Sequence, residues 1–246
     1  MSLISLKSVS KTFDSGTQAI ASLDLDVREG EFLSLVGPSG CGKSTALRII
    51  AGLIAPTTGS VTWPDGKREI GFVFQEATLM PWRNALDNAR LPLELSGTAR
   101  AEAEARSRQA LARVGLGEFQ KAYPRELSGG MKMRVSIARA IAAEPKLLLM
   151  DEPFAALDEL TRQSLNDDLL KLAREDGITV IFVTHSVYES AYLSDRVVVM
   201  TPRPGRVAAD ITIAQPAGRG AAYRLTSQFT DAAGKVSAAL GHAMAA

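Results

Sequence analysis

Cysteine and long apolar runs are both scarce in this sequence. Cys41 is the only cysteine among 246 residues, so an intrachain disulfide is impossible, which fits a reducing compartment. The apolar runs at 147–150, 178–183 and 197–200 are far shorter than the roughly 18 residues of a membrane span. The first residues also lack the apolar stretch of a secretory signal. We therefore expect a soluble, cytoplasmic chain that reaches a membrane only through a partner.

An excess of charge of either sign is also missing. Lys and Arg number 28 and Asp and Glu 27, which gives a net charge of +1. This balance offers no basic stripe for nucleic acid and no acidic tail. Hydrophobic residues make up 46% and charged residues 22%, proportions that exclude a disordered chain, a collagen-like chain and a long coiled coil. The length predicts one large domain, or a core with a smaller subdomain.

The hydrophobic pattern that is present predicts an α/β fold. Alternation at 3–9 and 20–27 is typical of half-exposed antiparallel strands, and 59–74 has the pattern of a hairpin with a turn at 64–66. Strands buried on both faces and separated by helices indicate a parallel sheet. Such strands are expected at 146–150, 178–183 and 196–200, and a further strand at 31–36. Helices are expected at 43–51, 128–143, 159–174 and 186–193, and two or more surface helices over 84–114. The tail after 203 has the Pro and Gly content of a loop and ends in an Ala-rich stretch.

Residues 37–45, GPSGCGKST, form a glycine-rich loop between a predicted strand and a predicted helix. They match G-x-x-x-x-G-K-[ST], in which glycines let successive backbone N–H groups point at phosphate oxygens. Lys43 supplies a point charge for the β- and γ-phosphates, the helix adds its positive end, and Ser44 offers a hydroxyl to Mg²⁺. Cys41 is a neutral spacer rather than a nucleophile, since no His base is nearby. The predicted nucleotide-binding residues are Gly37, Pro38, Ser39, Gly40, Cys41, Gly42, Lys43, Ser44 and Thr45.

A second acidic cluster follows a buried strand, where residues 147–152 read LLLMDE. The end of a parallel strand is where an open α/β sheet places its ligand site. Asp151 is suited to holding Mg²⁺, and Glu152 to polarising a water for attack on a γ-phosphate. Alone, the two acids could equally be a helix-capping pair. Together with the phosphate loop they predict hydrolysis of a nucleotide.

Residues 126–134, ELSGGMKMR, complete the set of motifs. With the loop and the acidic strand end, they make the chain resemble the ATP-binding subunit of an ABC transporter over residues 1–205. The stretch at 127–130 is similar to the family's signature motif, which faces the ATP held by the other subunit. Ser128 can cap a helix there, and Gly129 and Gly130 leave N–H groups bare for a γ-phosphate. Met131 replaces the family's glutamine and cannot make the hydrogen bonds of that side chain.

The resemblance also implies roles for single residues. Gln75 corresponds to the glutamine that touches Mg²⁺ and the attacking water, Asp158 to the aspartate at the dimer interface, and His185 to the histidine that contacts the γ-phosphate. Phe13 lies where the family stacks a ring on adenine, although a core position is the rival interpretation. The implied catalytic residues are Lys43, Gln75, Glu152 and His185, and the implied Mg²⁺ ligands are Ser44, Gln75 and Asp151.

Three further stretches, at 75–88, 151–162 and 200–206, look like the nitrate, sulfonate and taurine import branch. The implied function is the ATP-hydrolysing, energy-coupling subunit of an importer. It works as an ATP-dependent homodimer with integral membrane permease subunits and, indirectly, a solute-binding protein. A non-transport ATPase that acts on nucleic acid is the alternative, and the neutral charge counts against it. The residues implied to line the permease groove are Leu79, Met80, Pro81 and Trp82, although composition alone favours core packing for them.

The implied fold is a P-loop NTPase core with a parallel sheet, an N-terminal antiparallel β subdomain and a helical subdomain that carries the signature. We expect a single domain over 1–246: a nucleotide-binding core at about 1–84 and 145–215, a helical subdomain at about 85–144 and a tail at 216–246. The expected cofactors are ATP and Mg²⁺. The expected location is the cytoplasmic face of the inner membrane, as a peripheral subunit.

Overall fold

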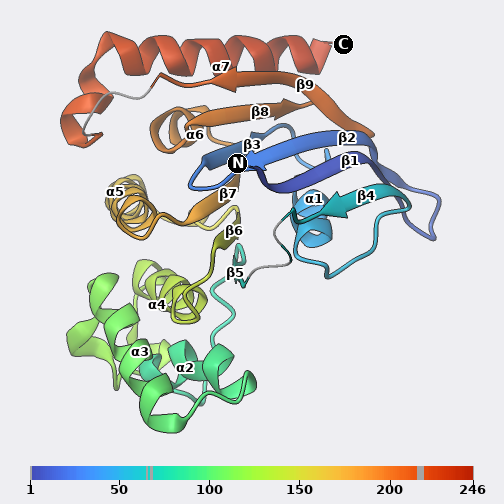
Figure 1. Cartoon of the computed structure of the whole chain (residues 1–246). Helices are drawn as coiled ribbons and strands as arrows, with labels where there is room; N and C mark the ends of the chain where they lie inside the picture. The colour runs from blue at the N-terminus through green and yellow to red at the C-terminus, as the bar shows by residue number, and fades with distance from the viewer. Residues whose placement is uncertain (1, 65, 67–68, 215–218, 246) are drawn as a thin grey trace. The chain divides into compact units, whose positions relative to one another are not determined.

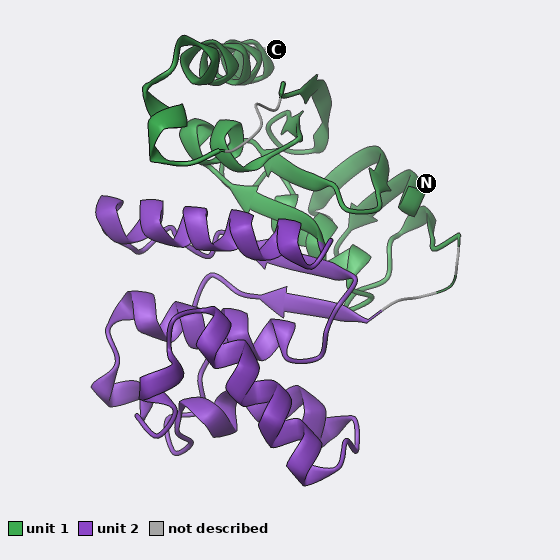
Figure 2. Ribbon diagram, turned by 60° about the vertical axis from the view of Figure 1, so that its left-hand side comes forward, with its two compact units in different colours: residues 1–67, 179–246 green, residues 68–178 purple. Residues whose placement is uncertain are grey.

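The chain forms two compact units (Figure 2), one made of residues 1–67 and 179–246 and the other of residues 68–178. The computed structural model describes residues 2–64, 66, 69–214 and 219–245. The first unit is therefore assembled from the two ends of the chain, and the second from its middle.

The first unit begins with antiparallel strands (Figure 1). β1 (Ser2–Thr12) pairs with both β2 (Gln18–Arg28) and β4 (Thr58–Thr62). Ile4 and Leu6 of β1 lie opposite Val27 and Leu25 of β2, and all four side chains are buried. The alternation at 3–9 and 20–27 thus places one apolar face of each strand in the core, which confirms the antiparallel prediction.

Parallel strands form the rest of this unit's core. β3 (Phe32–Val36) pairs in parallel with β7 (Thr179–Thr184) and with β8 (Arg196–Met200), and every residue of the three strands is buried. Their near-continuous Val, Ile, Leu and Phe residues suit burial on both faces. α1 (Lys43–Ile50) and α6 (Val187–Leu193) contact these strands. The strand order within the unit is β4-β1-β2-β9-β8-β3-β7.

After residue 203 the described part of the chain includes a strand and helices rather than only a loop-like tail. β9 (Gly205–Thr212) pairs antiparallel with β8 and, at Gly205 and Arg206, parallel with β2. η3 (Ala221–Leu225) and α7 (Ser227–Ala245) follow, and α7 contacts α6 and β8 and buries Phe229 and Val236. The loop prediction was wrong for β9, because this mostly exposed strand carries little hydrophobic signal and is fixed by its pairing partners.

The second unit combines parallel strands with packed helices. β5 (Ile70–Val73) runs parallel to β6 (Leu147–Asp151). α2 (Ala85–Leu95), α3 (Arg100–Arg113) and α4 (Gly129–Ile141) contact one another, and α4 also contacts β5 and α5 (Glu159–Glu175). The short 3-10 helices η1 (Gly117–Phe119) and η2 (Pro124–Glu126) lie between α3 and α4. These elements confirm the helices predicted for this part of the chain.

The hairpin predicted at 59–74 is wrong. β4 pairs antiparallel with β1, whereas β5 pairs parallel with β6 in the other unit. Alternating apolar residues identify a strand but not its partner, because pairing depends on contacts far along the chain. The Gly66 N–H does donate to the Trp63 carbonyl, while Asp65 in the predicted turn lies outside the described residues.

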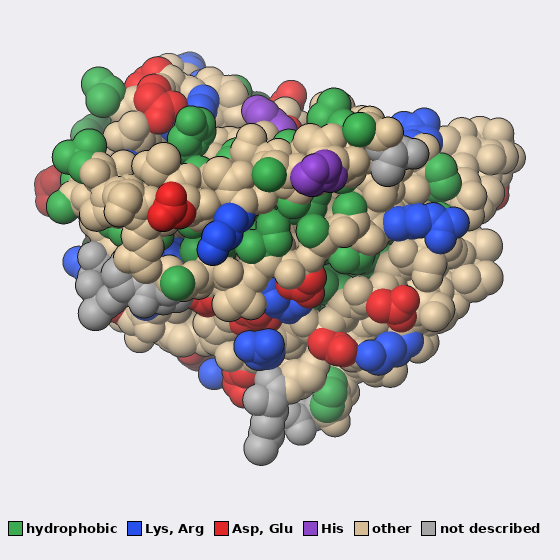
Figure 3. All heavy atoms as spheres, turned by 90° about the horizontal axis from the view of Figure 1, so that it is seen from above, with side chains coloured by type: hydrophobic (Ala, Val, Ile, Leu, Met, Phe, Trp, Pro, Cys, Tyr) green, Lys and Arg blue, Asp and Glu red, His purple; other side chains and the backbone are tan. Residues whose placement is uncertain are grey.

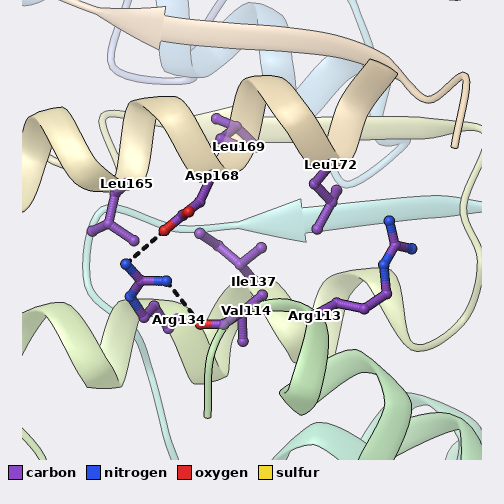
Figure 4. A pocket seen from close by; sticks show the side chains of 8 residues that line it. All are labelled: Arg113, Val114, Arg134, Ile137, Leu165, Asp168, Leu169 and Leu172. Atoms are coloured by element: carbon purple, nitrogen blue, oxygen red, sulfur yellow. Dashed lines mark hydrogen bonds and ion pairs between the residues drawn. The ribbon is translucent and has the colours of Figure 1, made fainter. Parts of the chain in front are cut away.

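A small pocket lies between α4 and α5 (Figure 4). Leu165 and Leu169 of α5 and Ile137 of α4 give it apolar walls. At its edge Arg134 Nη2 lies 2.6 Å from Asp168 Oδ2, and Arg134 Nη1 donates to the carbonyl of Val114 at 2.8 Å. Arg134 therefore ties α4 to α5 and to the C-cap residue of α3.

Within the described residues, none of the helices combines the length and apolarity that crossing a bilayer requires. On the face drawn in Figure 3, Lys and Arg side chains alternate with Asp and Glu. This mixture agrees with the net charge of +1 and leaves no basic track for nucleic acid on that face.

Candidate active site

The phosphate loop joins the buried strand β3 to the N-terminus of α1. Gly40 and Gly42 have φ angles of +76° and +103°, which side chains rarely permit. A Cβ added at Gly42 would also lie 2.8 Å from the carbonyl oxygen of Ala19 in β2. Glycine is therefore required for the curvature of the loop, and this curvature is the kind in which backbone N–H groups cradle an anion.

Lys43 is the first residue of α1 and is only 4% exposed. Its Nζ donates to the carbonyls of Gly37 at 2.7 Å and Pro38 at 3.0 Å. The ammonium is thus held against the loop by neutral acceptors, with which a phosphate oxygen can compete. The positive end of α1 favours the same negative charge.

Cys41 is fully buried within the loop. Its Sγ lies 3.8 Å from Lys43 Nζ and would be 2.9 Å from a Cβ added at Gly37. The carbonyl oxygen of Cys41 would be only 2.0 Å from a Cβ added at Gly205, so β9 begins in close contact with the loop. This packing fits the neutral-spacer interpretation of Cys41.

In the second unit, β6 ends at Asp151, which is 8% exposed, and Glu152 follows with a φ angle of +47°. This left-handed conformation is strained for a residue with a side chain, and such strain is found repeatedly at active sites and ligand-binding sites. The strain turns the chain sharply between two adjacent carboxylates. A buried carboxylate at a strand end suits metal binding, and a half-buried one beside it suits contact with water.

Ser128 is the N-cap of α4, as the sequence predicts, and its Oγ accepts a hydrogen bond from the Met131 N–H at 3.2 Å. A Cβ added at Gly130 would lie 2.7 Å from Thr161 Cγ2, so glycine lets α5 approach this helix terminus. Gly129 is exposed. The backbone N–H of Met131 donates this hydrogen bond, so the bond does not depend on the glutamine side chain that Met131 replaces.

Gln75 and His185 each follow a strand and are exposed, Gln75 two residues after β5 and His185 directly after β7. The turn that carries His185 is fixed by Thr184, whose Oγ1 donates to Glu189 at 2.5 Å and accepts from the Ser186 N–H at 3.0 Å. Both side chains can therefore meet a ligand without disturbing the core.

Asp158 is exposed and caps α5, where its Oδ1 accepts a hydrogen bond from the Thr161 N–H at 3.0 Å. This hydrogen bond lowers the pKa of the Asp158 carboxyl below its ordinary value. The contact explains the carboxylate's orientation within one chain. A role at a dimer interface stays a prediction.

Phe13 lies in the turn between β1 and β2, where its N–H donates to the Thr17 carbonyl. The ring is 40% exposed, and Lys11 Nζ lies 5.5 Å from its centroid. A plain core position is therefore wrong for this residue. The exposed ring is available to stack on a base, which remains a prediction.

Residues 79–82 are not core either, because Trp82 is 72% exposed and Pro81 is exposed, while Leu79 and Met80 are half-buried. Asn88 of α2 holds this segment through hydrogen bonds and is fully buried. Its Oδ1 accepts from the Met80 N–H at 2.8 Å, and its Nδ2 donates to the carbonyls of Met80, Arg83 and Asn84 at 3.2, 2.9 and 3.0 Å. A rigid loop thus presents Trp82 to solvent.

Arg203 and Arg139 also contact the predicted site segments, although no motif indicates either residue. Arg203 Nε donates to the carbonyl of Gly40 at 3.1 Å, so the 200–206 stretch contacts the phosphate loop. The sequence of that stretch resembles the import branch but does not indicate that it contacts the loop. Arg139, on α4, donates to the carbonyls of Ala77 and Thr78, a contact that no local pattern indicates.

Each unit carries part of the predicted site. The first unit holds the phosphate loop, Phe13 and His185. The second holds Gln75, residues 79–82, 128–131 and 151–152, and Asp158. The parts have the chemistry of a nucleotide hydrolase: a phosphate cradle, oxygen ligands for a cation, a carboxylate beside water and a glycine-flanked helix N-terminus.

Comparison with known proteins agrees with this chemistry. The family model described as ABC transporter matches residues 20–155. An uncharacterized ABC transporter ATP-binding protein, MJ0412 of Methanocaldococcus jannaschii, is 50% identical, with 83% of this chain and 79% of that protein covered. The taurine import ATP-binding protein TauB of Ruegeria pomeroyi is 42% identical (84% and 81% covered), and the aliphatic sulfonates import ATP-binding protein SsuB 1 of Xanthomonas axonopodis pv. citri is 45% identical (78% and 78%).

Among solved structures, the dimeric ATP-binding cassette MJ0796 in a post-hydrolysis state with ADP and Pi is similar at a TM-score of 0.77 and 35% identity. That similarity covers 87% of this chain and 100% of the other. The chain belongs to the ABC transporter family, and it is an ATPase of that family.

Proposed function

We propose that this chain is the energy-coupling ATPase subunit of an importer for a small sulfonate, with taurine and related compounds as the first candidates. The observation that carries the proposal is the identity of more than 40% to proteins named for taurine and aliphatic sulfonate import, over more than three quarters of the chain. The phosphate loop and the acidic strand end supply the required chemistry. The solute itself is read by other subunits, so these residues do not select it.

The residues that bind MgATP are assigned by their chemistry. The 37–45 loop and Lys43 hold the phosphates, and Phe13 stacks on adenine. Ser44, Gln75 and Asp151 provide the oxygen ligands that Mg²⁺ prefers. Within the described residues, His, Cys, Asp and Glu side chains form no cluster of three or more that would hold a metal alone. That donor set fits an ion shared with substrate phosphates, where bound Mg²⁺ neutralises developing charge.

Hydrolysis requires a base, a γ-phosphate contact and a second subunit. Glu152 orients and deprotonates the attacking water, and His185 contacts the γ-phosphate. The bare N–H groups around Ser128, Gly129 and Gly130, with Met131 as the next residue, face the nucleotide of a second copy. The dimeric MJ0796 cassette supports a homodimer, with Asp158 at its interface.

The 79–82 segment is the proposed docking site for the permease. Trp82 is a large, exposed apolar side chain on a loop fixed by Asn88, which suits a rigid contact with another protein. Gln75, the first residue of the same loop, is proposed to touch Mg²⁺. A permease movement at Trp82 would therefore shift Gln75 and gate hydrolysis. The subunit would then lie at the cytoplasmic face of the inner membrane, and a solute-binding protein would act through the permease.

Reconstitution tests the proposal. The subunit is purified with the membrane protein that it retains in a detergent extract and is placed in lipid vesicles with the matching solute-binding protein. We expect ATP-dependent uptake of taurine or an alkanesulfonate, with faster ATP hydrolysis when the loaded binding protein docks. Nitrate, an anion of different shape, serves as the comparison solute. Uptake of nitrate alone would overturn the sulfonate assignment, and recovery of DNA or RNA without a membrane protein would overturn the transport role.

A further inference from the structure

Arg139 joins two parts of the second unit that are far apart in sequence. It lies near the C-terminal end of α4, the helix whose N-terminus is the signature motif. Its Nη1 donates to the Thr78 carbonyl at 2.9 Å, and its Nη2 donates to the Ala77 carbonyl and to Thr78 Oγ1, both at 3.0 Å. One guanidinium thus holds two consecutive residues between Gln75 and Trp82.

The partners of this half-buried arginine are all neutral. Nη2 also contacts Ser136 Oγ at 3.3 Å, and within the described part of the chain no carboxylate lies within ion-pair distance of Arg139. Burial lowers the pKa of its guanidinium below the ordinary value. A partly desolvated charge whose protein partners are all neutral acceptors loses stabilisation when those acceptors move away.

The segment that Arg139 holds is itself strained. Thr78 has a φ angle of +46°, a left-handed conformation that is especially unfavourable for a β-branched residue. Hydrogen bonds from Arg139 hold Thr78 in this conformation, and hydrogen bonds with Asn88 hold residues 80–84. Trp82 therefore lies on a loop that is attached both to α2 and to α4.

We propose that Arg139 is a positioning residue that couples the 77–84 segment to the signature helix α4. A change in the position of the segment or of the helix then alters the position of the other. α4 spans about 17 Å between Ser128 and Arg139, at about 1.5 Å per residue. The proposal rests on the proposed function, in which Trp82 meets a permease and Ser128 meets the nucleotide of a second subunit. Coupling of this kind is reciprocal, so it can be measured without the permease.

The test uses amide hydrogen exchange in the purified full chain. The Met80 and Arg83 amides are hydrogen-bonded, to Asn88 Oδ1 and to the Met80 carbonyl, and they report on the segment. In a Glu152→Gln background, addition of MgATP should form the dimer and change exchange across 77–84 by at least about 5-fold. The Arg139→Gln variant should still bind ATP and dimerise, but MgATP should then change the amide exchange rates across 77–84 by less than about 2-fold.

Two further variants separate coupling from loss of stability. Arg139→Lys keeps the charge and the fold but lacks the forked donors, so most of the ATP-dependent change should also be lost. Arg134→Gln removes an arginine from the same helix whose partners are Val114, Ser164 and Asp168, and it should keep the ATP-dependent change. If the dimers of Arg139→Lys and of Arg139→Gln both keep the full ATP-dependent change in exchange across 77–84, the proposal is overturned. A chain that never dimerises with ATP would instead contradict the proposed function, and the proposal would fall with it.

Discussion

Single side chains at the phosphate loop are restricted by close contacts as well as by chemistry. Gly42 cannot carry a Cβ because of its φ angle and because of the Ala19 carbonyl. Lys43 is held by the carbonyls of Gly37 and Pro38, and Gly40 is contacted by Arg203. The loop is therefore shaped before any nucleotide arrives, which reduces the cost of ordering it on binding.

Lys43→Ala should abolish ATP hydrolysis and weaken ATP binding strongly, because it removes the buried ammonium from the loop. A loss of at least about 10²-fold in kcat/KM is expected for a group that stabilises the transferred phosphoryl charge. Calorimetric titration with ATP and a phosphate-release assay measure the two effects. Lys43→Arg keeps the charge and serves as the control for charge alone. Turnover close to wild type in Lys43→Ala would contradict the assignment of this loop.

At the scale of elements, the segment between β5 and α2 is held by Asn88 and presents Trp82. Asn88 makes four hydrogen bonds from a fully buried position. Networks of this kind are costly to break, because buried backbone groups lose their partners. The loop is therefore a rigid element rather than a flexible connection, as a mechanical role in coupling requires.

Asn88→Ala should lower the free energy of unfolding by about 2–4 kcal/mol, because the Met80 N–H and several carbonyls lose a buried partner. Urea unfolding followed by circular dichroism measures the change. Asn84→Ala is the matched control, since Asn84 only caps α2 through a bond to the Asp87 N–H and should cost about 1 kcal/mol. Equal costs for the two variants would mean that Asn88 does not organise the loop.

Trp82→Ala should leave the free energy of unfolding within about 0.5 kcal/mol of wild type, because the side chain is mostly exposed. ATP binding by the free subunit should also be unchanged, while recovery of the permease from detergent extract should fall. Leu95→Ala, at an 80% exposed leucine, is the control for removing an exposed apolar side chain. A loss of stability of about 3 kcal/mol or more would identify Trp82 as a core residue instead.

The elements that the sequence predicted well are those with a strong local pattern. β3, β6, β7 and β8 carry near-continuous apolar residues, and α4 carries both a cap and an apolar stripe. Motif residues were found because glycine, lysine and paired acids occur there at characteristic spacings. By contrast, β9, the partners of β4 and β5, and the role of Arg139 depend on distant contacts. Arg139 reaches Thr78 across 61 residues, and no local window contains that information.

At the scale of the whole molecule, the proposed site residues are distributed over both units. The first supplies the phosphate loop and the second supplies the acidic strand end and the signature helix. The signature helix is capped by Ser128 within the chain, and its exposed Gly129 leaves room for a ligand. A second copy that places its nucleotide there completes the proposed site, so the ATPase should work only as a dimer.

The most direct test of this account is the mass of Glu152→Gln in solution, with and without MgATP. The substitution preserves shape but removes the proposed base, so ATP should bind, remain unhydrolysed and hold two subunits together. Size-exclusion chromatography with light scattering at micromolar concentration should give twice the monomer mass with MgATP and the monomer mass with MgADP. Ser128→Arg in the same background fills the shared surface and should restore the monomer. A Glu152→Gln protein that binds MgATP but stays monomeric would contradict the shared-site mechanism.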